Sequence, residues 1–330
     1  MKEESPKYVL AVDIGGTKMD IAFINQYGNL LEPAQRLLVP FDEQGVAKPD
    51  AILDLLEPYV NRAKKEFGSF PGIGLSICGN IDTETGDAVL VANLYWRNVP
   101  FGRMTWERFG VPNYPATDVR MALMAEVLWG KAKGLKNVAW MTLGTGYGGY
   151  LFLDGKLYDG AHGFAGNLGH NIYDERTGEL CGCGQKGCFE SFVAGPAIAS
   201  QGQLAVEQGE SKILKHLSEN DRLLVTTKMV FQAESLGDQA SIEIIEEVVR
   251  KLGISLSSMV NLLDLEMIVL GGSVWKGSPE FIQCVDRRVR DFLMTEEAKR
   301  DLKIATESFP NSALVGAAAD VFLHTGLLKL

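Results

Sequence analysis

Two short stretches rich in glycine and threonine contain the residues best suited to bind a phosphate chain. The first runs from Asp13 to Lys18 (Asp-Ile-Gly-Gly-Thr-Lys), and the second runs from Met141 to Gly149 (Met-Thr-Leu-Gly-Thr-Gly-Tyr-Gly-Gly). Glycine permits positive φ and lets backbone N–H groups approach an anion. Successive N–H groups in such a turn form an anion-binding nest, and threonine hydroxyls add donors. The sequence therefore predicts two anion-binding turns, with ordinary tight hairpins as the alternative.

A histidine and three cysteines have the spacing of a zinc site. His170, Cys181, Cys183 and Cys188 form the pattern H-x10-C-x-C-x4-C, and glycines at positions 182, 184 and 187 let the short loop curl. Three thiolates and one imidazole are a closed tetrahedral ligand set for Zn²⁺, with no position left for water. We therefore predict a structural zinc, with a reduced cysteine-rich loop without metal as the alternative.

One carboxylate, that of Asp118, stands at the start of a predicted helix. Residues 119–131 are rich in alanine and carry apolar side chains at helical spacing, as helix-forming segments do. Aspartate is a common N-cap in that place. The position therefore leaves two interpretations open, a helix cap and a functional carboxylate.

Strands and helices alternate in a way that predicts an α/β protein with two similar halves. Strands are predicted over residues 8–14, 19–25, 36–39, 73–77, 266–270 and 302–306, with hairpins over 82–92 and 137–160. Helices are predicted over residues 49–67, 104–109, 119–131, 239–261, 279–293 and 315–328, within a mostly helical segment at 193–263. Short apolar runs that end at glycine indicate buried strands. Each glycine turn is thus expected to lie between two strands.

Composition narrows the class of protein. The chain has 330 residues, of which 46% are hydrophobic and 22% are charged, values typical of a globular protein with about two domains. It contains no apolar run of the ~18 residues that a membrane span needs. The polar first residues lead directly into a strand, so we expect no signal peptide.

The net charge and the cysteines bear on partners and compartment. A net charge of −10 without a basic patch argues against binding to nucleic acid or to an anionic membrane. Three of the five cysteines lie within eight positions, which favours a reduced, cytoplasmic protein with a metal site over a disulfide scaffold. Cys78 and Cys284 are predicted to be isolated buried thiols.

Together these motifs resemble the ROK family of sugar kinases and repressors, which has an actin/hexokinase-like (ribonuclease H-like) fold. The resemblance covers essentially the whole chain. It is carried by the two glycine turns, the Asp118 segment, Gly163-Phe-Ala-Gly166 with Gly169-His170, the segment from Cys181 to Glu190, and Ile268-Val-Leu-Gly-Gly272.

The resemblance implies two α/β lobes with sugar and triphosphate in the cleft between them. Residues 1–117 would form a small lobe, and residues 118–311 a large lobe with a zinc-binding loop at 161–192. A closing helix at about 312–330 would pack back on the small lobe. Homodimers are common in the family, so we expect one here.

The resemblance also implies ATP-dependent transfer of the γ-phosphoryl group to a sugar hydroxyl, most often the 6-hydroxyl of a hexose. Asp118 would be the general base, and Asp13 would position Mg²⁺ through water. The residues implied to bind ATP and its phosphates are Asp13, Gly15, Gly16, Thr17, Lys18, Gly144, Thr145, Gly146, Gly271 and Gly272. Because phosphoryl transfer needs mostly positioning and charge neutralisation, Lys18, Mg²⁺ and the N–H groups of the turns suit it.

Further residues are assigned to the sugar. The resemblance implies that the zinc-bound histidine, here His170, also faces the sugar. The metal would fix one ring nitrogen and leave the other as a donor to a sugar oxygen. Glu190 matches a sugar-binding carboxylate of the family, with a solvated loop glutamate as the alternative, and Asn93 is either a ligand or a turn residue. The predicted sugar ligands are Gly79, Asn80, Asn93, Thr117, Asn167, His170 and Glu190.

Two positions depart from the family pattern. Thr117 stands where the family usually has asparagine before the catalytic aspartate, and Asn167 stands where it usually has glutamate three residues before the zinc-bound histidine. An acceptor-only carboxylate thus becomes an amide with donors and acceptors. We therefore do not expect simple glucose specificity, and the substrate could be an epimer, a modified sugar or a glycoside.

Three other functions were considered. A DNA-binding repressor of the family is disfavoured because only twelve residues precede Asp13 and the net charge is negative. A sugar-binding member that has lost catalysis is consistent with Thr117 and Asn167, although the phosphate turns, Lys18 and Asp118 are retained. Another kinase of the same superfold is disfavoured by the zinc cluster.

Overall fold

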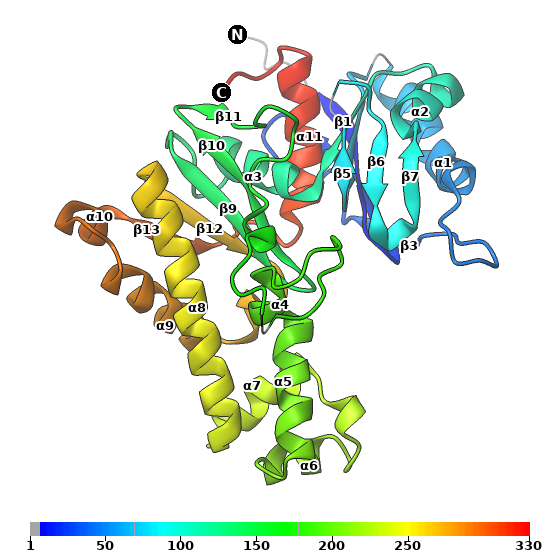
Figure 1. Ribbon diagram of the computed structural model, residues 1–330. Coiled ribbons are helices and arrows are strands. Elements are labelled where there is room, and N and C mark those ends of the chain that lie inside the picture. Colours follow the sequence, from blue (N-terminus) through cyan, green and yellow to red (C-terminus); the bar gives the residue numbers. More distant parts are fainter. Residues whose placement is uncertain (1–6, 69, 83, 177) are drawn as a thin grey trace. The chain divides into compact units, whose positions relative to one another are not determined.

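The computed structural model describes residues 7–68, 70–82, 84–176 and 178–330 (Figure 1). Contacts within the chain divide it into two compact units. The first unit contains Met1–Lys136, Leu151–Ala165 and Glu307–Leu330, and the second contains Asn137–Tyr150 and Gly166–Thr306.

The first unit is built on a five-stranded sheet with the order β3-β2-β1-β4-β8. Strand β1 (Tyr8–Ile14) pairs antiparallel with β2 (Lys18–Asn25) and parallel with β4 (Ile73–Ile77). Strand β2 pairs antiparallel with β3 (Gln35–Leu38), and β4 pairs parallel with β8 (Asn113–Thr117). The parallel strands β1, β4 and β8 therefore bring their carboxyl ends to one edge of the sheet.

Strand β1 divides its side chains between two buried layers. Leu10, Val12 and Ile14 pack in the layer that contains residues of α1 (Pro49–Phe67). Val9 and Ala11 pack in the layer that contains residues of α11 (Ser312–His324). Successive side chains of a strand point to opposite faces, and a strand buried on both faces has a continuous apolar sequence. This is why the apolar run at 8–14 is a strand, as predicted.

Helix α11 packs closely on α3 (Asp118–Leu128) and on β4 (Figure 1). A Cβ atom added at Gly316 would lie 1.6 Å from the carbonyl oxygen of Met121, and one added at Gly74 would lie 2.0 Å from that of Ala317. Backbone therefore meets backbone at both places. The C-terminal helix, whose N-cap Asn311 stands 298 residues after Asp13, is thereby fixed against the strands and helix that carry Asp13 and Asp118.

A small three-stranded sheet with the order β5-β6-β7 completes the first unit. Its strands and the two helices beside it are β5 (Asn80–Ile81), β6 (Ala88–Val91), η1 (Ala92–Leu94), β7 (Trp96–Val99) and α2 (Phe101–Phe109). The predicted hairpin at 82–92 is present, with its turn closed by the Gly86 N–H and the Asp82 carbonyl at 2.8 Å. The buried Trp96 donates its indole N–H to the Ala47 carbonyl at 2.7 Å.

The second five-stranded sheet has the order β11-β10-β9-β12-β13. Its strands are β9 (Val138–Leu143), β10 (Tyr147–Leu153), β11 (Lys156–Leu157), β12 (Met267–Gly271) and β13 (Lys303–Thr306). Strand β12 pairs parallel with both β9 and β13. By contacts, β11 and the last residues of β10 belong to the first unit.

Helices make up most of the rest of the second unit. They are η2 (Leu168–His170), α4 (Glu190–Val193), α5 (Gly195–Glu207), α6 (Lys212–Leu217), η3 (Arg222–Leu224), α7 (Thr227–Ser235), α8 (Gln239–Leu263), η4 (Trp275–Gly277), α9 (Pro279–Asp291) and α10 (Glu296–Asp301). The longest, α8, is capped by the Asp238 carboxylate, which accepts from the Ser241 N–H at 3.0 Å. Such caps satisfy N–H groups that have no partner within the helix.

The predicted α/β class is confirmed, and each glycine turn lies between two strands as expected. Several elements were not predicted, among them β7, β8, α4 and α10. Strand β8 contains Pro115, which cannot donate to a ladder, but β8 is the last strand of the sheet and pairs on one side with β4. Cys284 was predicted to be buried and is exposed, because the buried side of α9 is formed by Phe281, Val285 and Val289.

The contact division differs from the predicted lobes at 1–117 and 118–311. It places α3 in the first unit, because α3 packs extensively against α11. It also places residues Leu151–Ala165 there, whereas the rest of the predicted loop at 161–192 belongs to the second unit.

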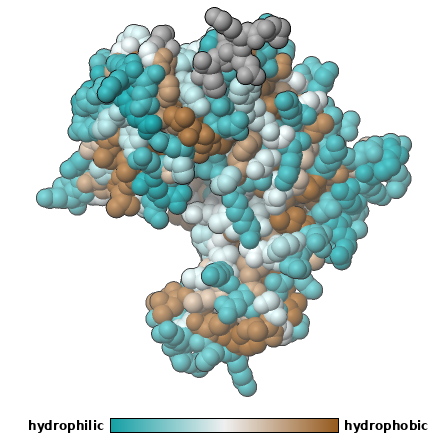
Figure 2. All heavy atoms as spheres, turned by 180° about the vertical axis from the view of Figure 1, so that it is seen from behind, coloured by the Kyte–Doolittle hydropathy of each residue, from teal (hydrophilic) through white to brown (hydrophobic). Residues whose placement is uncertain are grey.

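The surface mixes hydrophilic and hydrophobic residues. Figure 2 shows hydrophilic side chains over much of one face, interrupted by separate hydrophobic patches. Among the described residues, no helix combines the length and the apolar character that crossing a bilayer requires.

Replacement of Gly316 by alanine tests the contact between α3 and α11. The added methyl group would overlap the Met121 carbonyl, so we expect the free energy of unfolding to fall by about 3 kcal/mol or more, the upper range for overpacking. Urea denaturation followed by circular dichroism measures this change. The control is Gly148→Ala in β10, where an added Cβ meets nothing within 4 Å, and equal losses in the two variants would contradict the proposed packing constraint.

Candidate functional site

The first glycine turn connects β1 to β2. The Gly15 N–H donates to the Lys18 carbonyl at 2.9 Å. In the described part of the chain, the N–H groups of Gly16 and Thr17 have no protein acceptor. A Cβ at Gly16 would lie 2.8 Å from the Cβ of Asn93, so glycine is required for this close approach. The turn thus presents unused donors, as an anion-binding nest does.

The carboxylate of Asp13, near the end of β1, accepts hydrogen bonds from one hydroxyl group and one amide group. Ser76 Oγ donates to Asp13 Oδ1 at 2.7 Å, and Asn311 Nδ2 donates to Asp13 Oδ2 at 3.0 Å. Asn311 Nδ2 also lies 3.0 Å from Asp20 Oδ2. Burial raises the pKa of Asp13, against the opposing effect of the Ser76 and Asn311 hydrogen bonds. A bound cation would favour the charged form of this carboxylate.

Asp20 is the second carboxylate of this network. Arg36 makes a two-point contact with it, Nε to Oδ1 at 2.7 Å and Nη2 to Oδ2 at 2.8 Å. These hydrogen bonds lower the pKa of Asp20. Asp20 thus accepts from three donors, two on Arg36 and one on Asn311, whereas Asp13 accepts from two, on Ser76 and Asn311.

Asp118 is the first residue of α3 and is not its N-cap. The cap is Thr117, whose Oγ1 accepts from the Arg120 N–H at 3.3 Å. The Asp118 carboxylate is half-buried and accepts from the Val119 N–H at 3.0 Å. Burial, and then the negative charge of Asp13, raise the pKa of Asp118 to about 6. A carboxylate with a pKa near neutrality is suited to take a proton from a hydroxyl.

Other predicted residues gather around these carboxylates. Burial together with the charges of Asp118 and Asp13 raises the pKa of Cys78 to about 12, against the opposing effect of Asn93. Cys78, half-buried rather than fully buried as predicted, therefore remains a thiol at neutral pH. Gly79 lies against β6, where an added Cβ would be 2.7 Å from the Leu90 carbonyl oxygen.

The second glycine turn connects β9 to β10 in the second unit. The Gly144 N–H donates to the Gly146 carbonyl at 2.9 Å, and Thr145 at the tip is exposed. The Glu190 carboxylate lies directly behind this turn. Its Oε2 accepts from the Tyr147 N–H at 3.3 Å and would lie 2.9 Å from a Cβ at Gly146. The alternative of a solvated loop glutamate is therefore wrong for Glu190.

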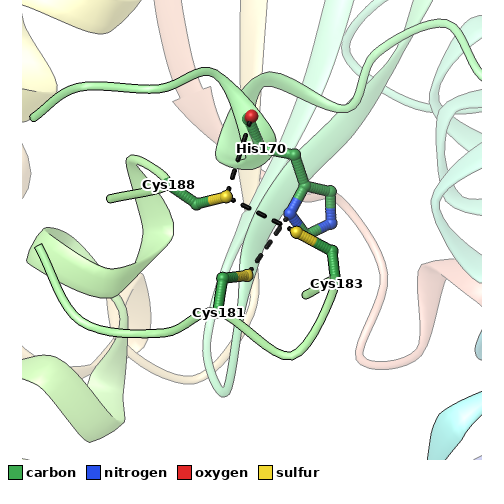
Figure 3. Close-up of side chains that lie close together, drawn as sticks. All are labelled: His170, Cys181, Cys183 and Cys188. Atoms are coloured by element: carbon green, nitrogen blue, oxygen red, sulfur yellow. Dashed lines mark hydrogen bonds between the residues drawn. The ribbon is translucent and has the colours of Figure 1, made fainter. Parts of the chain in front are cut away.

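The four predicted zinc ligands converge (Figure 3). All four ligand atoms lie within 4.8 Å of one another. Cys183 Sγ lies 3.5 Å from Cys188 Sγ, and Cys181 Sγ lies 3.6 Å from His170 Nδ1. Tetrahedral Zn–S bonds of about 2.3 Å place neighbouring sulfurs about 3.7 Å apart. The cluster therefore fits Zn²⁺, with Nδ1 of His170 as the nitrogen turned toward the sulfurs.

The thiols of the cluster have unequal environments. Burial raises the pKa of Cys181 and of Cys188. Burial also acts on Cys183, but hydrogen bonds from the Gln185 N–H and from the neighbouring thiols outweigh it and lower the pKa of Cys183. Cys181 Sγ donates to Glu190 Oε1 at 3.0 Å. Since metal binding requires thiolates, a bound Zn²⁺ would end this donation and release Oε1 of Glu190.

Glycine contacts and aromatic rings hold the zinc loop on the second unit. A Cβ at Gly169 would lie 1.8 Å from the Tyr147 carbonyl oxygen, so the segment before His170 lies directly on the β10 backbone. Phe189 packs on Tyr147 at 5.3 Å and on Tyr173 at 5.6 Å between ring centroids. Contacts of Gly169, before the cysteines, and of Phe189, after them, therefore fix the position of the loop that carries His170. Asn167, which precedes η2, is exposed.

A cavity of about 1010 Å³ adjoins the second glycine turn. Gly144 and Thr145 line it together with the start of α5, the length of α7 and the segment after β12. The predicted ATP residues Gly271 and Gly272 lie beneath this wall rather than in it. A Cβ at Gly271 would lie 2.0 Å from the Trp140 ring, and Gly272 has φ of +102° against the Leu143 carbonyl. Glycine at these two positions therefore permits close packing within the protein, and the next residue, Ser273, lines the cavity.

The structure thus brings the predicted residues together in two groups, one on each unit. On the first unit Asp13, Asn93 and Asp118 share one electrostatic environment with Cys78. On the second unit Glu190 joins the glycine turn to the zinc ligands. Sequence reasoning missed Ser76, Asn311, Asp20 and Arg36. An Asn before an alanine-rich helix was the available signal for Asn311, since Asn is a preferred N-cap.

Comparison with known proteins gives one family. The sequence matches the family described as ROK family over residues 9–323. A glucokinase of Halalkalibacterium halodurans is 28% identical over 306 residues, which are 92% of this chain and 91% of that protein. A glucokinase of Streptomyces griseus, solved in complex with glucose and AMPPNP, has a TM-score of 0.76 at 25% identity and covers 94% of this chain and 98% of its own.

Repressors are also similar to this chain. A xylose repressor of Caldicellulosiruptor bescii is 28% identical over 264 residues, which are 80% of this chain. The match spans 65% of that repressor's own length.

Elemental analysis of the purified chain tests the zinc site. We expect about one zinc per chain, because the four ligand atoms have tetrahedral spacing, and a content near zero in Cys183→Ser, which removes one ligand. The control variant is Cys284→Ser, an exposed cysteine outside the cluster, which should keep its zinc. Wild-type protein with three reactive thiols at the site and no zinc would contradict the prediction.

A second prediction concerns Asn311. In Asn311→Asp the cap acceptor for Leu314 remains, but the donor shared by Asp13 and Asp20 becomes a third carboxylate. We expect a loss of unfolding free energy of about 1–3 kcal/mol at pH 7.5. Like charges raise the pKa of the new group in the folded state, so this loss should shrink as the pH falls toward 4.5.

The matched control for Asn311 is serine, which can cap the helix but adds no charge. Its loss of unfolding free energy should vary less between pH 4.5 and pH 7.5 than that of Asn311→Asp. Denaturant unfolding of both variants and wild type over this pH range makes the comparison. A pH-independent loss in Asn311→Asp would show that the carboxylates are not coupled through this residue.

Proposed function

Because this chain belongs to the ROK family, we propose that it is an ATP-dependent sugar kinase that transfers the γ-phosphoryl group to a hydroxyl of a hexose or hexose derivative. Supporting relatives are glucokinases over nearly the whole chain, one of them solved with glucose and an ATP analogue. The observation that carries the proposal is the half-buried Asp118, whose pKa is raised to about 6 beside Asp13 and the first glycine turn.

We propose Asp118 as the general base. It lies on the first turn of a helix whose cap is supplied by Thr117, so its carboxylate is not needed for capping. A hydroxyl is a weak nucleophile at neutral pH, and a positioned carboxylate that takes its proton typically contributes 10²–10⁴-fold to the rate. We propose the 6-hydroxyl as the acceptor by analogy with the family.

The nucleotide is proposed to use groups that the structure presents on each unit. On the first unit these are the Gly16 and Thr17 N–H groups and the exposed Lys18. On the second unit they are the turn at Gly144 and the cavity of about 1010 Å³ beside it, which is large enough for a nucleoside. Asp13 fits Mg²⁺, since its two oxygens keep free lone pairs after accepting from Ser76 and Asn311. The cation would supply charge neutralisation for the phosphates.

On the second unit, His170 and Glu190 are the residues that we propose contact sugar hydroxyls. With Nδ1 turned to the zinc cluster, the Nε2 side of the His170 ring is the one left to donate. Zinc would also free Glu190 Oε1 from Cys181. The metal is thus proposed to shape the sugar ligands without taking part in phosphoryl transfer. A homodimer remains part of the proposal.

A second candidate function is a sugar-binding regulator with impaired catalysis. The similarity to xylose repressors favours it. Thr117 and Asn167 also favour it, because sugar kinases of the family usually have asparagine and glutamate at these two positions. Sugar-dependent release of ADP distinguishes the two functions. A coupled screen over hexoses, amino sugars and glycosides would show no sugar-dependent ADP for a regulator, whereas isothermal titration calorimetry would still detect binding.

Asp118→Asn tests the assignment of the base. We expect turnover to fall by about 10²–10⁴-fold, because the amide cannot accept the hydroxyl proton, while sugar binding by calorimetry and thermal unfolding change little. Wild-type kcat/KM should also decline below about pH 6, since protonated Asp118 is inactive and its pKa is raised to about 6. Near-normal turnover in Asp118→Asn, with the acidic limb retained, would remove Asp118 from this role.

A further inference from the structure

The first unit contains a cavity of its own, in addition to the cavity described above for the second unit. Its volume is about 640 Å³. It lies between the turn at residues 84–86, helix α2, the start of β8 and the end of α11. Asn113 begins β8 and Thr117 ends it, and a strand rises about 3.3 Å per residue. The start of β8 is therefore about 13 Å from the end that leads into Asp118.

A buried ion pair forms part of the cavity wall. Arg120 Nη1 donates to Asp320 Oδ1 at 2.8 Å, and the two side chains are 11% and 3% exposed. Asp159 lies 3.8 Å from Arg120 Nε. The His324 Nδ1 atom lies 2.9 Å from the Asp320 carbonyl oxygen. Charged groups so deeply placed are normally paired, and here they border an open volume.

Asn113 presents an acceptor that has no partner. Its Nδ2 donates to the Gly102 carbonyl at 3.1 Å, whereas its Oδ1 is buried and makes no hydrogen bond with any described residue. A flipped amide would set its oxygen against the Gly102 carbonyl, so the donor contact fixes the orientation. A buried acceptor without a partner is rare. Because the oxygen is almost fully enclosed, a ligand donor would reach it after a small movement of the wall.

Aromatic surfaces face the same volume. Trp106 on α2 lines the cavity with 53% of its surface exposed. The rings of Tyr114 and His324, which also line it, stack at 4.6 Å between centroids. Flat apolar faces beside hydrogen-bonding groups suit a ligand that has both C–H and O–H groups.

The charge balance of the wall excludes an anionic ligand. Three carboxylates, those of Glu84, Asp159 and Asp320, stand against the guanidinium groups of Arg103 and Arg120. The sum is −1, or zero when His324 is protonated. A phosphate would therefore meet no net positive charge. The wall carries both donors and acceptors, and a hydroxyl can pair with either.

We propose that this cavity is a binding site for a neutral carbohydrate, distinct from the sugar that would be phosphorylated. The ligand would donate a hydroxyl to Asn113 Oδ1, place a C–H face on Trp106 and hydrogen-bond the charged groups at Arg120 and Asp320. Arg120 is on the same helical turn as Asp118. Binding here does not depend on the kinase activity proposed above.

Nuclear magnetic resonance of the full chain with ¹⁵N-labelled tryptophan tests this site. The probes are D-glucose, N-acetyl-D-glucosamine and maltose, titrated without nucleotide. We expect the indole N–H resonance of Trp106, assigned by its absence in Trp106→Phe, to shift and saturate with at least one probe. The resonances of Trp96 and Trp275, which are 2% and 1% exposed, serve as internal references.

Two variants locate the binding. Thr85→Arg fills the cavity mouth from an exposed turn and should abolish the saturable shift, and Asn113→Leu should weaken it at least tenfold. The Arg variant keeps the test decisive where Asn113→Leu is unfolded.

Three outcomes would overturn the proposal. They are no shift of the Trp106 resonance with any probe, a shift that persists unchanged in Thr85→Arg, and a response to glucose 6-phosphate but to no neutral sugar. Because no nucleotide is present and no turnover is measured, loss of the kinase proposal would leave this result unaffected.

Discussion

One carboxamide, that of Asn311, holds together the parts of the first unit that carry the proposed chemistry. Its Oδ1 accepts from the Leu314 N–H and so begins α11, which forces the amide nitrogen toward Asp13 and Asp20. Two carboxylates this close repel each other. The shared donor, with Arg36 on Asp20 and Ser76 on Asp13, makes the arrangement stable. Burial and, to a smaller extent, the charge of Asp20 raise the pKa of Asp13, whereas burial and the charge of Asp13 raise that of Asp118.

The elements that carry these residues follow from local sequence, but their partners do not. Strand β1 and helix α1 were predicted with the bounds that the structure shows, because a run of apolar residues ending at Gly15 and a helix framed by Pro49 and Gly68 are local signals. Ser76 and Asn311 stand 63 and 298 residues from Asp13. No local pattern reports a contact at such a separation. The cysteine spacing was more informative, because four ligands of one ion must converge wherever the loop lies.

Glycine has a different use in each of the predicted motifs. At Gly16 it allows the close approach of Asn93 to the first glycine turn, and at Gly169 it allows the segment before His170 to lie on the β10 backbone. Gly271 and Gly272 were assigned to ATP, yet both are explained by contacts with Trp140 and Leu143. A glycine-rich motif therefore marks close backbone approach, and only the structure tells whether the approaching group is a ligand or the protein itself. The nucleotide is better proposed for the cavity lined by Gly144, Thr145 and Ser273.

The capping role of Thr117 bears on which sugar the chain would accept. Its Oγ1 accepts from the Arg120 N–H at 3.3 Å, so the hydroxyl keeps its proton to donate and one of its two acceptor lone pairs. An asparagine in its place would offer a carbonyl and an NH₂ group at the same time. Thr117 would therefore offer a neighbouring sugar group one donor and one acceptor, beside the acceptor-only carboxylate of Asp118. Because a buried hydroxyl left unpaired is disfavoured by about 1–3 kcal/mol, we propose that the exchange of asparagine for threonine at this position changes which sugar is preferred.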